Sequence, residues 1–131
     1  TLEIGWVEPL IPGKLALELN GNVTWFGDNP RAGAGHARLT QQPTYQLQPW
    51  VHYYVSPKAS VGLGYFGQFG GVQQLDGFSN GLRSNEHAIR ANVQYFFTPT
   101  LQLSTTVAHD VAVTGGFRQV FLLDVRLALV F

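Results

Sequence analysis

The segment QVFLLDVRLALVF, from Gln119 to Phe131, carries a large apolar side chain at every second position, from Phe121 onward. Asp124 and Arg126, its only charged residues, lie at positions between them. Successive side chains of a β-strand point to opposite faces of the sheet. This spacing therefore predicts a strand with one apolar and one polar face.

Six other segments show the same alternation. Together with the last segment they predict seven strands. Most are long enough for the ~9–11 residues that a tilted strand needs to cross a bilayer. Pro49 lies inside one of them and lacks a backbone N–H, so we expect a bulge or kink there. The six segments are Leu2–Val7, Lys14–Phe26, Tyr45–Val55, Ala59–Gly70, Ala88–Phe97 and Leu101–Val113.

The connections between these segments are of two alternating kinds. Pro9–Gly13, Ser56–Lys58 and Thr98–Thr100 are short and contain proline, whereas Gly27–Gln42 and Gly71–Asn85 are long, polar and rich in glycine. The last connection, around Thr114–Gly116, is short but falls on the side of the long loops. Short turns at one rim and longer loops at the other are typical of outer-membrane β-barrels.

The composition supports a membrane barrel and excludes several other classes. Charged residues make up 12% of the 131 residues, about half the ~25% of a soluble domain. The net charge is zero, so a basic nucleic-acid footprint is absent. The chain has no cysteine, which excludes disulfides, thiolate metal sites and cysteine nucleophiles. Its apolar runs are too short for a membrane-spanning helix. We therefore expect an all-β fold with one domain over residues 1–131, an antiparallel up-and-down transmembrane β-barrel.

A soluble β-sandwich also predicts alternation and is the main competing fold. Sandwich strands are usually ~5–6 residues long, however, and these segments are longer. Aromatic residues also gather near the ends of the apolar faces, as in the girdles of membrane barrels. One rim carries Trp25, Tyr45 and Phe69, and the other carries Tyr53, Tyr95, Phe97 and Phe131.

The end of the chain resembles the signal by which the outer-membrane assembly machinery recognises its substrates. Val125, Leu127, Leu129 and Phe131 carry this resemblance. It implies that the last strand descends to the periplasm of a Gram-negative bacterium and that Thr1 lies outside the cell. Bacterial single-chain barrels have even strand numbers. Seven strands therefore indicate the C-terminal portion of a larger barrel of about 12 strands, or a strand missed by the pattern.

The order of motifs resembles a family of small outer-membrane barrels associated with the meta-pathway of phenol degradation. The resemblance covers most of the chain, aligns with the family's C-terminal half and implies a chain about twice as long. It implies uptake of small, often aromatic or hydrophobic compounds. The motifs are EIGW (Glu3–Trp6), NVTWFGDN (Asn22–Asn29), QQPTYQLQPWVHYYVSP (Gln41–Pro57), ASVGLGYFGQFGG (Ala59–Gly71) and LRSNEHAIRANVQYFFTP (Leu82–Pro99).

The polar face of the expected barrel is the candidate functional site, because it would line the lumen. Amides outnumber charges there, which favours weakly selective passage of small neutral solutes. We therefore expect a passive outer-membrane channel for small organic solutes, including aromatic ones. A closed barrel filled by these side chains, or a docking barrel that anchors a partner complex, remains the alternative. The predicted pore-lining residues are Glu18, Asn20, Asn22, Gln46, Gln48, His52, Gln68, Arg90, Asn92, Gln94, Asp110, Asp124 and Arg126, together with Glu3 and Lys14.

Nothing in the sequence indicates an enzyme, a cofactor or a metal. Gly62-x-Gly64-x-x-Gly67 matches a dinucleotide motif in letters only, since it lies inside a strand and no helix follows. Its glycines indicate instead a place where the barrel bends or a loop approaches. The four histidines have no metal-ligand spacing, and only His109–Asp110 hints at catalysis. The expected partners are outer-membrane lipid and lipopolysaccharide, the assembly machinery and a small solute, with no nucleic acid.

Overall fold

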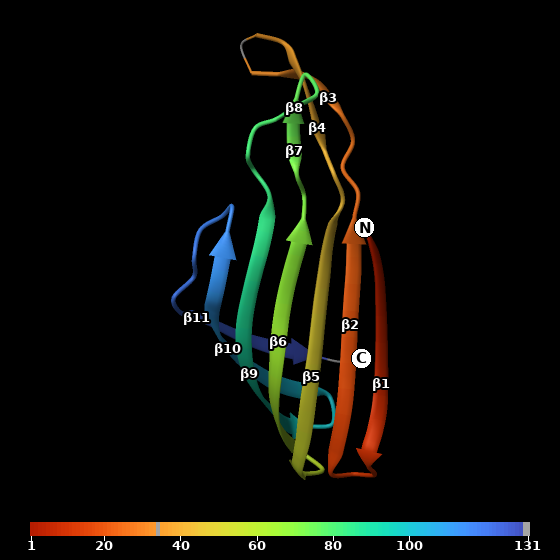
Figure 1. Ribbon diagram of the computed structural model, residues 1–131. Coiled ribbons are helices and arrows are strands. Elements are labelled where there is room, and N and C mark those ends of the chain that lie inside the picture. The colour runs from red at the N-terminus through yellow and green to blue at the C-terminus, as the bar shows by residue number, and fades with distance from the viewer. Residues whose placement is uncertain (34, 130–131) are drawn as a thin grey trace.

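The computed structural model describes residues 1–33 and 35–129, and its main element is one antiparallel sheet of seven strands (Figure 1). The order in the sheet follows the chain, so each strand pairs with its neighbours in sequence. All seven expected strands are confirmed. They are β1 (Leu2–Ile11), β2 (Leu15–Thr24), β5 (Thr44–Ser56), β6 (Ala59–Gly70), β9 (Ser84–Thr98), β10 (Leu101–Thr114) and β11 (Leu122–Leu129).

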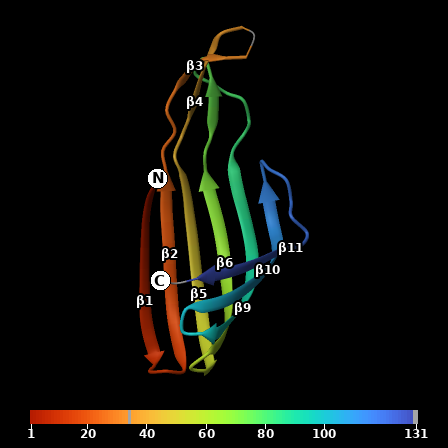
Figure 2. The same ribbon diagram turned by 180° about the vertical axis from the view of Figure 1, so that it is seen from behind.

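The sheet curls into an open half-barrel. In Figure 1 β11 passes behind β5 and β6, and in Figure 2, seen from the other side, it passes in front of them. The hollow of the curled sheet is called the concave face below, and the other side the outward face. The pairing among the described residues does not join β1 to β11. The chain is thus a partial barrel.

A second sheet of four short strands stands beyond one end of the half-barrel (Figure 1). Its strands lie in the segments Gly27–Gln42 and Gly71–Asn85, where the sequence pattern predicts connections and no further strands. The paired hairpins simply continue past the main sheet, since β4 pairs with β7. The strands are β3 (Asn29–Ala32), β4 (Ala37–Gln41), β7 (Gln73–Leu75) and β8 (Phe78–Ser79). This end is called the loop end below, and the opposite end the turn end.

An exposed ion pair joins two parts of this second region. Arg38 Nε donates a hydrogen bond to Asp28 Oδ2 at 3.2 Å. The Asp28 carboxylate raises the pKa of Arg38 above its ordinary value, mainly through hydrogen bonding and then through its charge. Both groups are well exposed to solvent, so the pair adds little to stability.

The short connections lie at the turn end, with two adjustments to their predicted bounds. β5 and β6 are joined at Pro57–Lys58, and β9 and β10 at Pro99–Thr100, as expected. The first strand is longer than predicted, and Pro9 lies inside it opposite Ala16. Lys14 accordingly lies in the β1–β2 turn rather than in a strand.

The bulge expected at Pro49 is absent from the strand register. Leu47 faces Gly67 and Trp50 faces Gly64, which keeps one register on both sides of the proline. The β5–β6 ladder instead lacks pairs at Gln48 and Pro49, while Leu19 of β2 still faces Pro49. The missing N–H is thus accommodated by a gap in the ladder.

The two faces of the seven-stranded sheet have opposite polarity and opposite exposure. On the outward face large apolar side chains are exposed, for example Leu63 at 68% and Leu127 at 68%. The expected rim aromatics Trp25, Tyr45, Tyr53, Tyr95 and Phe97 are also exposed, and Phe131 lies outside the described residues. A soluble sandwich would bury this apolar face. An exposed apolar face on the wall of a barrel is what contact with lipid requires.

Among the described residues, none forms a helix long and apolar enough to cross a membrane.

Candidate functional site

The concave face brings most of the predicted pore-lining residues together, in rows that run from strand to strand. The row nearest the loop end contains Asn22, Gln46 and Gln68, which face one another in register. Asn22 donates to Gln46 at 2.6 Å, and Gln46 donates to Gln68 at 2.6 Å. The three amides therefore form a hydrogen-bonded chain that lies along the wall.

Two acidic residues extend this row at its ends. Glu3 faces Asn22 from β1, as its predicted place on the polar face requires, and Glu86 faces Gln68 from β9. Glu86 was missed in the sequence because the apolar alternation of that strand becomes clear only at Ala88. Glu86 lies an even number of residues before Arg90, Asn92 and Gln94 and therefore shares their face of the strand. This spacing could have identified it from the sequence.

Closer to the turn end, Glu18 connects two other predicted residues. Its carboxylate accepts a hydrogen bond from Asn20 Nδ2 at 2.5 Å. His52 Nε2 lies 3.0 Å from Glu18 Oε2, and the His52 residue is only 9% exposed. One oxygen of Glu18 thus accepts a hydrogen bond within β2, and the other lies close to the imidazole of His52 on β5.

The middle of the face is occupied by aromatic rings lying over glycines. Trp50 and His52 of β5 stack side by side, with ring centroids 5.8 Å apart and planes inclined by 18°. They face Gly64 and Gly62 of β6. The sequence predicted a bend or an approaching loop at these glycines, but what approaches them is side chains of the neighbouring strand.

Arg90 of β9 faces Gly64 from the other side of β6. Its Nη1 donates to Gln48 Oε1 at 3.3 Å, and its guanidinium carbon lies 4.0 Å from the centre of the Phe66 ring. Arg90 and Gln48 thus meet across β6, which separates their strands. Phe66, which was not among the predicted site residues, is 7% exposed.

Toward the turn end the face is lined by small hydroxyls and amides. Asn92 Nδ2 donates to Ser104 Oγ at 3.0 Å and to Thr106 Oγ1 at 2.8 Å. Gln102 donates to Gln94 at 3.2 Å. The amides of β9 are therefore fixed by β10, again along the wall.

The three remaining predicted residues lie in two separate places. Asp110 is 2% exposed, and its Oδ2 accepts the backbone N–H of Gln119 at 2.6 Å. Asp124 and Arg126 pair with each other, with Nη2 2.8 Å from Oδ2. Asp124 faces Thr106 and Asp110 faces Ala88, so the two carboxylates are not paired neighbours.

The histidines give no support to catalysis or metal binding. His109 and Asp110 are consecutive strand residues and point to opposite faces, so they do not meet. His109 Nδ1 instead contacts the carbonyl of Val120 at 2.5 Å. Over residues 1–33 and 35–129, no group of three or more His, Asp and Glu side chains is arranged to hold a metal ion.

Three residues of the expected assembly signal lie on the outward face of β11. Val125, Leu127 and Leu129 are all exposed there. Phe131 lies outside the described residues.

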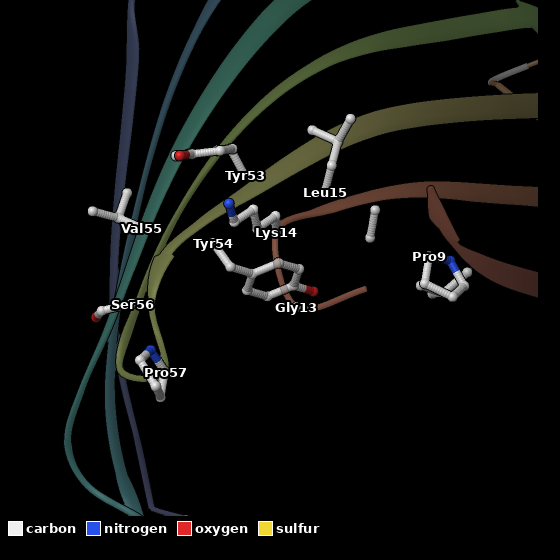
Figure 3. Close-up of a pocket in the computed structure, with 11 residues that line it drawn as sticks. Pro9, Gly13, Lys14, Leu15, Tyr53, Tyr54, Val55, Ser56 and Pro57 are labelled. Atoms are coloured by element: carbon white, nitrogen blue, oxygen red, sulfur yellow. The ribbon is translucent and has the colours of Figure 1, made fainter. Parts of the chain in front are cut away.

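A cleft of about 760 Å³ lies at the turn end, between the β1–β2 and β5–β6 hairpins. Figure 3 shows Lys14, Tyr53 and Tyr54 around it, with Pro9 and Pro57 at its margins. Its lining is mostly apolar, so it differs from the amide-rich concave face.

Comparison with known proteins agrees with this geometry. Residues 2–122 match the family described as "Putative MetA-pathway of phenol degradation". The crystal structure of the COG4313 outer membrane channel from Pseudomonas putida F1 is similar, with a TM-score of 0.89 and 31% sequence identity. No curated protein matches the chain in sequence.

The structural match covers 98% of this chain and 48% of the channel, so the chain spans about half the length of that protein. This agrees with a partial barrel. The family match extends over the strands β1 to β10 and ends at the first residue of β11. The chain therefore belongs to the phenol-degradation family of outer-membrane β-barrels of Gram-negative bacteria.

Proposed function

We propose that this chain forms part of the wall of a passive channel for small organic solutes. The observation that carries the proposal is the polar concave face, which continues from Asn22 and Gln46 at the loop end to Asn92 and Gln94 near the turn end. Polar groups that line the lumen on both sides of the central aromatic rings support a water-filled path. The likeness to an outer membrane channel supports the same function.

The direction of the hydrogen bonds favours an open lumen over a filled one. The amide chain Asn22–Gln46–Gln68 and the contacts of Asn92 run between neighbouring strands. Donor groups that bond to a neighbouring strand in this way lie along the wall and do not reach across the barrel. We therefore assign the thirteen predicted pore-lining residues to the wall of the path, with amides giving weak selectivity and the charged groups tuning it.

The test is the permeability of the full-length protein that contains this chain. The purified protein is refolded into lipid vesicles, and the swelling rate is measured with neutral solutes of increasing size. We expect fast swelling with small solutes and a sharp fall as solute size increases. A protein that is folded, as judged by its circular dichroism, yet leaves swelling at the rate of empty vesicles would contradict the proposal. That outcome would favour the docking barrel.

The same proposal assigns roles to the outward face. Its exposed apolar side chains contact outer-membrane lipid and lipopolysaccharide, as the outward band of a membrane barrel does. Val125, Leu127, Leu129 and Phe131 act as the signal for the assembly machinery. The expected result of removing Phe131 is a lower amount of protein in the outer membrane, measured by fractionation and immunoblotting.

A further inference from the structure

The concave face contains a polar recess of about 310 Å³ that extends across β1, β2 and β5. Small-molecule sites usually have volumes of ~300–1,000 Å³, so this recess suits a ligand of only a few atoms. The strand register places its side chains on the concave face, and the recess therefore opens toward the lumen. The residues that define it are Glu3, Gly5, Asn20, Asn22 and Gln48.

The side-chain oxygen of Asn20 is directed into this recess. Asn20 Nδ2 donates to Glu18 Oε1 at 2.5 Å. An ionised carboxylate only accepts hydrogen bonds, so the nitrogen of Asn20 lies toward Glu18 and its oxygen lies on the other side. Asn20 Oδ1 is 2.9 Å from the position that a Cβ atom on Gly5 would occupy. Glycine at position 5 thus leaves room for a carbonyl oxygen in the recess.

Glu3 adds a carboxylate that has no counter-ion within the described part of the chain. Over residues 1–33 and 35–129, no basic side-chain nitrogen lies within 4.0 Å of its oxygens. Glu18 differs, since its Oε2 lies 3.0 Å from His52 Nε2. Glu3 is also exposed, so its carboxylate is accessible to a solute in the lumen.

The positive charge of Arg90 is held on the far side of Gln48. Arg90 Nη1 donates to Gln48 Oε1 at 3.3 Å, and its guanidinium carbon lies 4.0 Å from the centre of the Phe66 ring. Both contacts direct the guanidinium toward β6 and β9, whereas the recess lies toward β1. The recess therefore combines one carboxylate with an amide oxygen, and its lining contains no basic residue.

We infer that the polar recess is a binding site for small organic cations with a primary ammonium group. The inference rests on the proposed channel function and names a solute class that the wall holds at this point. An ammonium group has three N–H donors and no acceptor. One N–H donates to the Glu3 carboxylate in a charge-assisted bond, and a second donates to Asn20 Oδ1.

The composition of the recess disfavours two other kinds of cation. A quaternary ammonium ion has the same charge but no N–H, so it makes no hydrogen bond with Asn20 or Glu3. A calcium ion takes six to eight oxygen ligands, usually from several carboxylates. The recess has a single carboxylate, and the described residues contain no cluster of three acidic or histidine side chains that could hold a metal.

The test compares the binding of propylammonium and tetramethylammonium chloride to the folded full-length protein. Binding is measured by saturation-transfer NMR in a deuterated detergent. The two cations have equal charge and similar size, but only propylammonium has N–H donors. We expect its dissociation constant to be about threefold to tenfold lower. Equal binding of the two cations, or binding of neither, would overturn the inference.

Two substitutions in the recess test its parts separately. Glu3→Gln removes the charge but keeps the size of the side chain, and we expect it to weaken propylammonium binding about tenfold. Gly5→Ala places a methyl group against Asn20 Oδ1, and we expect it to weaken binding by about threefold or more. Unchanged affinity in the Glu3→Gln variant would contradict the assignment of the site.

Glu8→Gln is the matched control for the loss of charge. Glu8 is an exposed residue of the same strand, but it faces Leu17 on the outward face. We expect this variant to bind propylammonium as the wild-type protein does. Equal weakening by Glu8→Gln and Glu3→Gln would show that overall charge, and not the recess, attracts the cation. Gly27→Ala is the control for the added methyl group, because nothing lies within 4 Å of it.

A competition experiment distinguishes the ammonium site from a metal site. Calcium chloride is titrated against bound propylammonium at constant ionic strength. We expect calcium to displace it only at concentrations above the dissociation constant of propylammonium. Tighter binding of calcium than of propylammonium would replace the inference with a metal site.

The NMR measurement does not require conduction, so it separates this inference from the channel function. If vesicles with the folded protein do not swell, but propylammonium binds to the wild-type protein and not to the Glu3→Gln variant, the recess is a binding site and the channel proposal fails. If the vesicles swell but propylammonium does not bind, the channel proposal stands and the inference about the recess fails.

Discussion

The outward and concave faces of the seven-stranded sheet satisfy their side chains in different ways. Leu63 on the outward face is exposed, and its apolar side chain needs only contact with lipid. Asn92 on the concave face is nearly buried and donates to both Ser104 and Thr106. Hydrogen bonds between strands thus hold the side chains of the concave face in place, whereas the side chains of the outward face need only contact with lipid.

The largest expected effect comes from placing a charge on the outward face. Leu63→Arg puts a guanidinium into the hydrocarbon layer, and we expect a loss of about 2–4 kcal/mol in the free energy of unfolding. The matched change on the other face is Asn20→Arg, beside the Glu18 carboxylate. We expect a much smaller loss there, since the concave face is polar.

Urea unfolding of the full-length protein in lipid vesicles measures both variants. Similar losses for Leu63→Arg and Asn20→Arg would mean that the two faces do not differ in their solvent. The distinction drawn from their exposure would then fail.

A smaller effect is expected where a concave-face contact is purely steric. Gly64→Ala forces the Trp50 indole off the backbone of β6, which we expect to destabilise the protein by about 1–3 kcal/mol. In a Trp50→Leu background the same substitution is expected to cost less, because the obstructing ring is gone.

Gly27→Ala is the control for this prediction, since nothing lies within 4 Å of the added Cβ. A double-mutant cycle of Gly64→Ala and Trp50→Leu, again by urea unfolding, gives their coupling. Additive effects would show that the indole does not lie against Gly64.

The smallest effect is expected from the amide chain at the loop end. Gln46→Ala removes the hydrogen bonds with Asn22 and Gln68. Because water replaces the lost partners in a half-buried site, we expect a loss of about 1 kcal/mol or less in the free energy of unfolding. Urea unfolding measures it, and a loss as large as that of Leu63→Arg would mean that water does not reach this row.

The faces of the sheet were predictable from sequence, but the rows on them were not. Alternation alone places Gln48, Trp50 and His52 of β5 on one side, and the structure confirms this. Which residues of β6 they meet depends on the strand register. A shift of two residues keeps every side chain on its face but changes all of its cross-strand partners. The opposition of Trp50, Gly64 and Arg90 is of this kind.

The errors of the sequence analysis have a common physical origin. The second sheet was missed because β3, β7 and β8 have no more than four residues each, too few to show a period of two. Its strands form because the hairpins of the main sheet keep β4 and β7 side by side. Pro49 was predicted to make a bulge or a kink, because the sequence does not show that a gap in the β5–β6 ladder can accommodate it.

The sequence by itself determined that the chain is all-β, that its strands are long enough to span a membrane, and which side chains share a face. These properties follow from spacing and composition, which are local. Only the tertiary structure decided that Glu18 meets His52, that Asp124 pairs with Arg126, and that the Trp50 indole lies against Gly64. These contacts depend on register, curvature and side-chain direction, which are set by the pairing of whole strands.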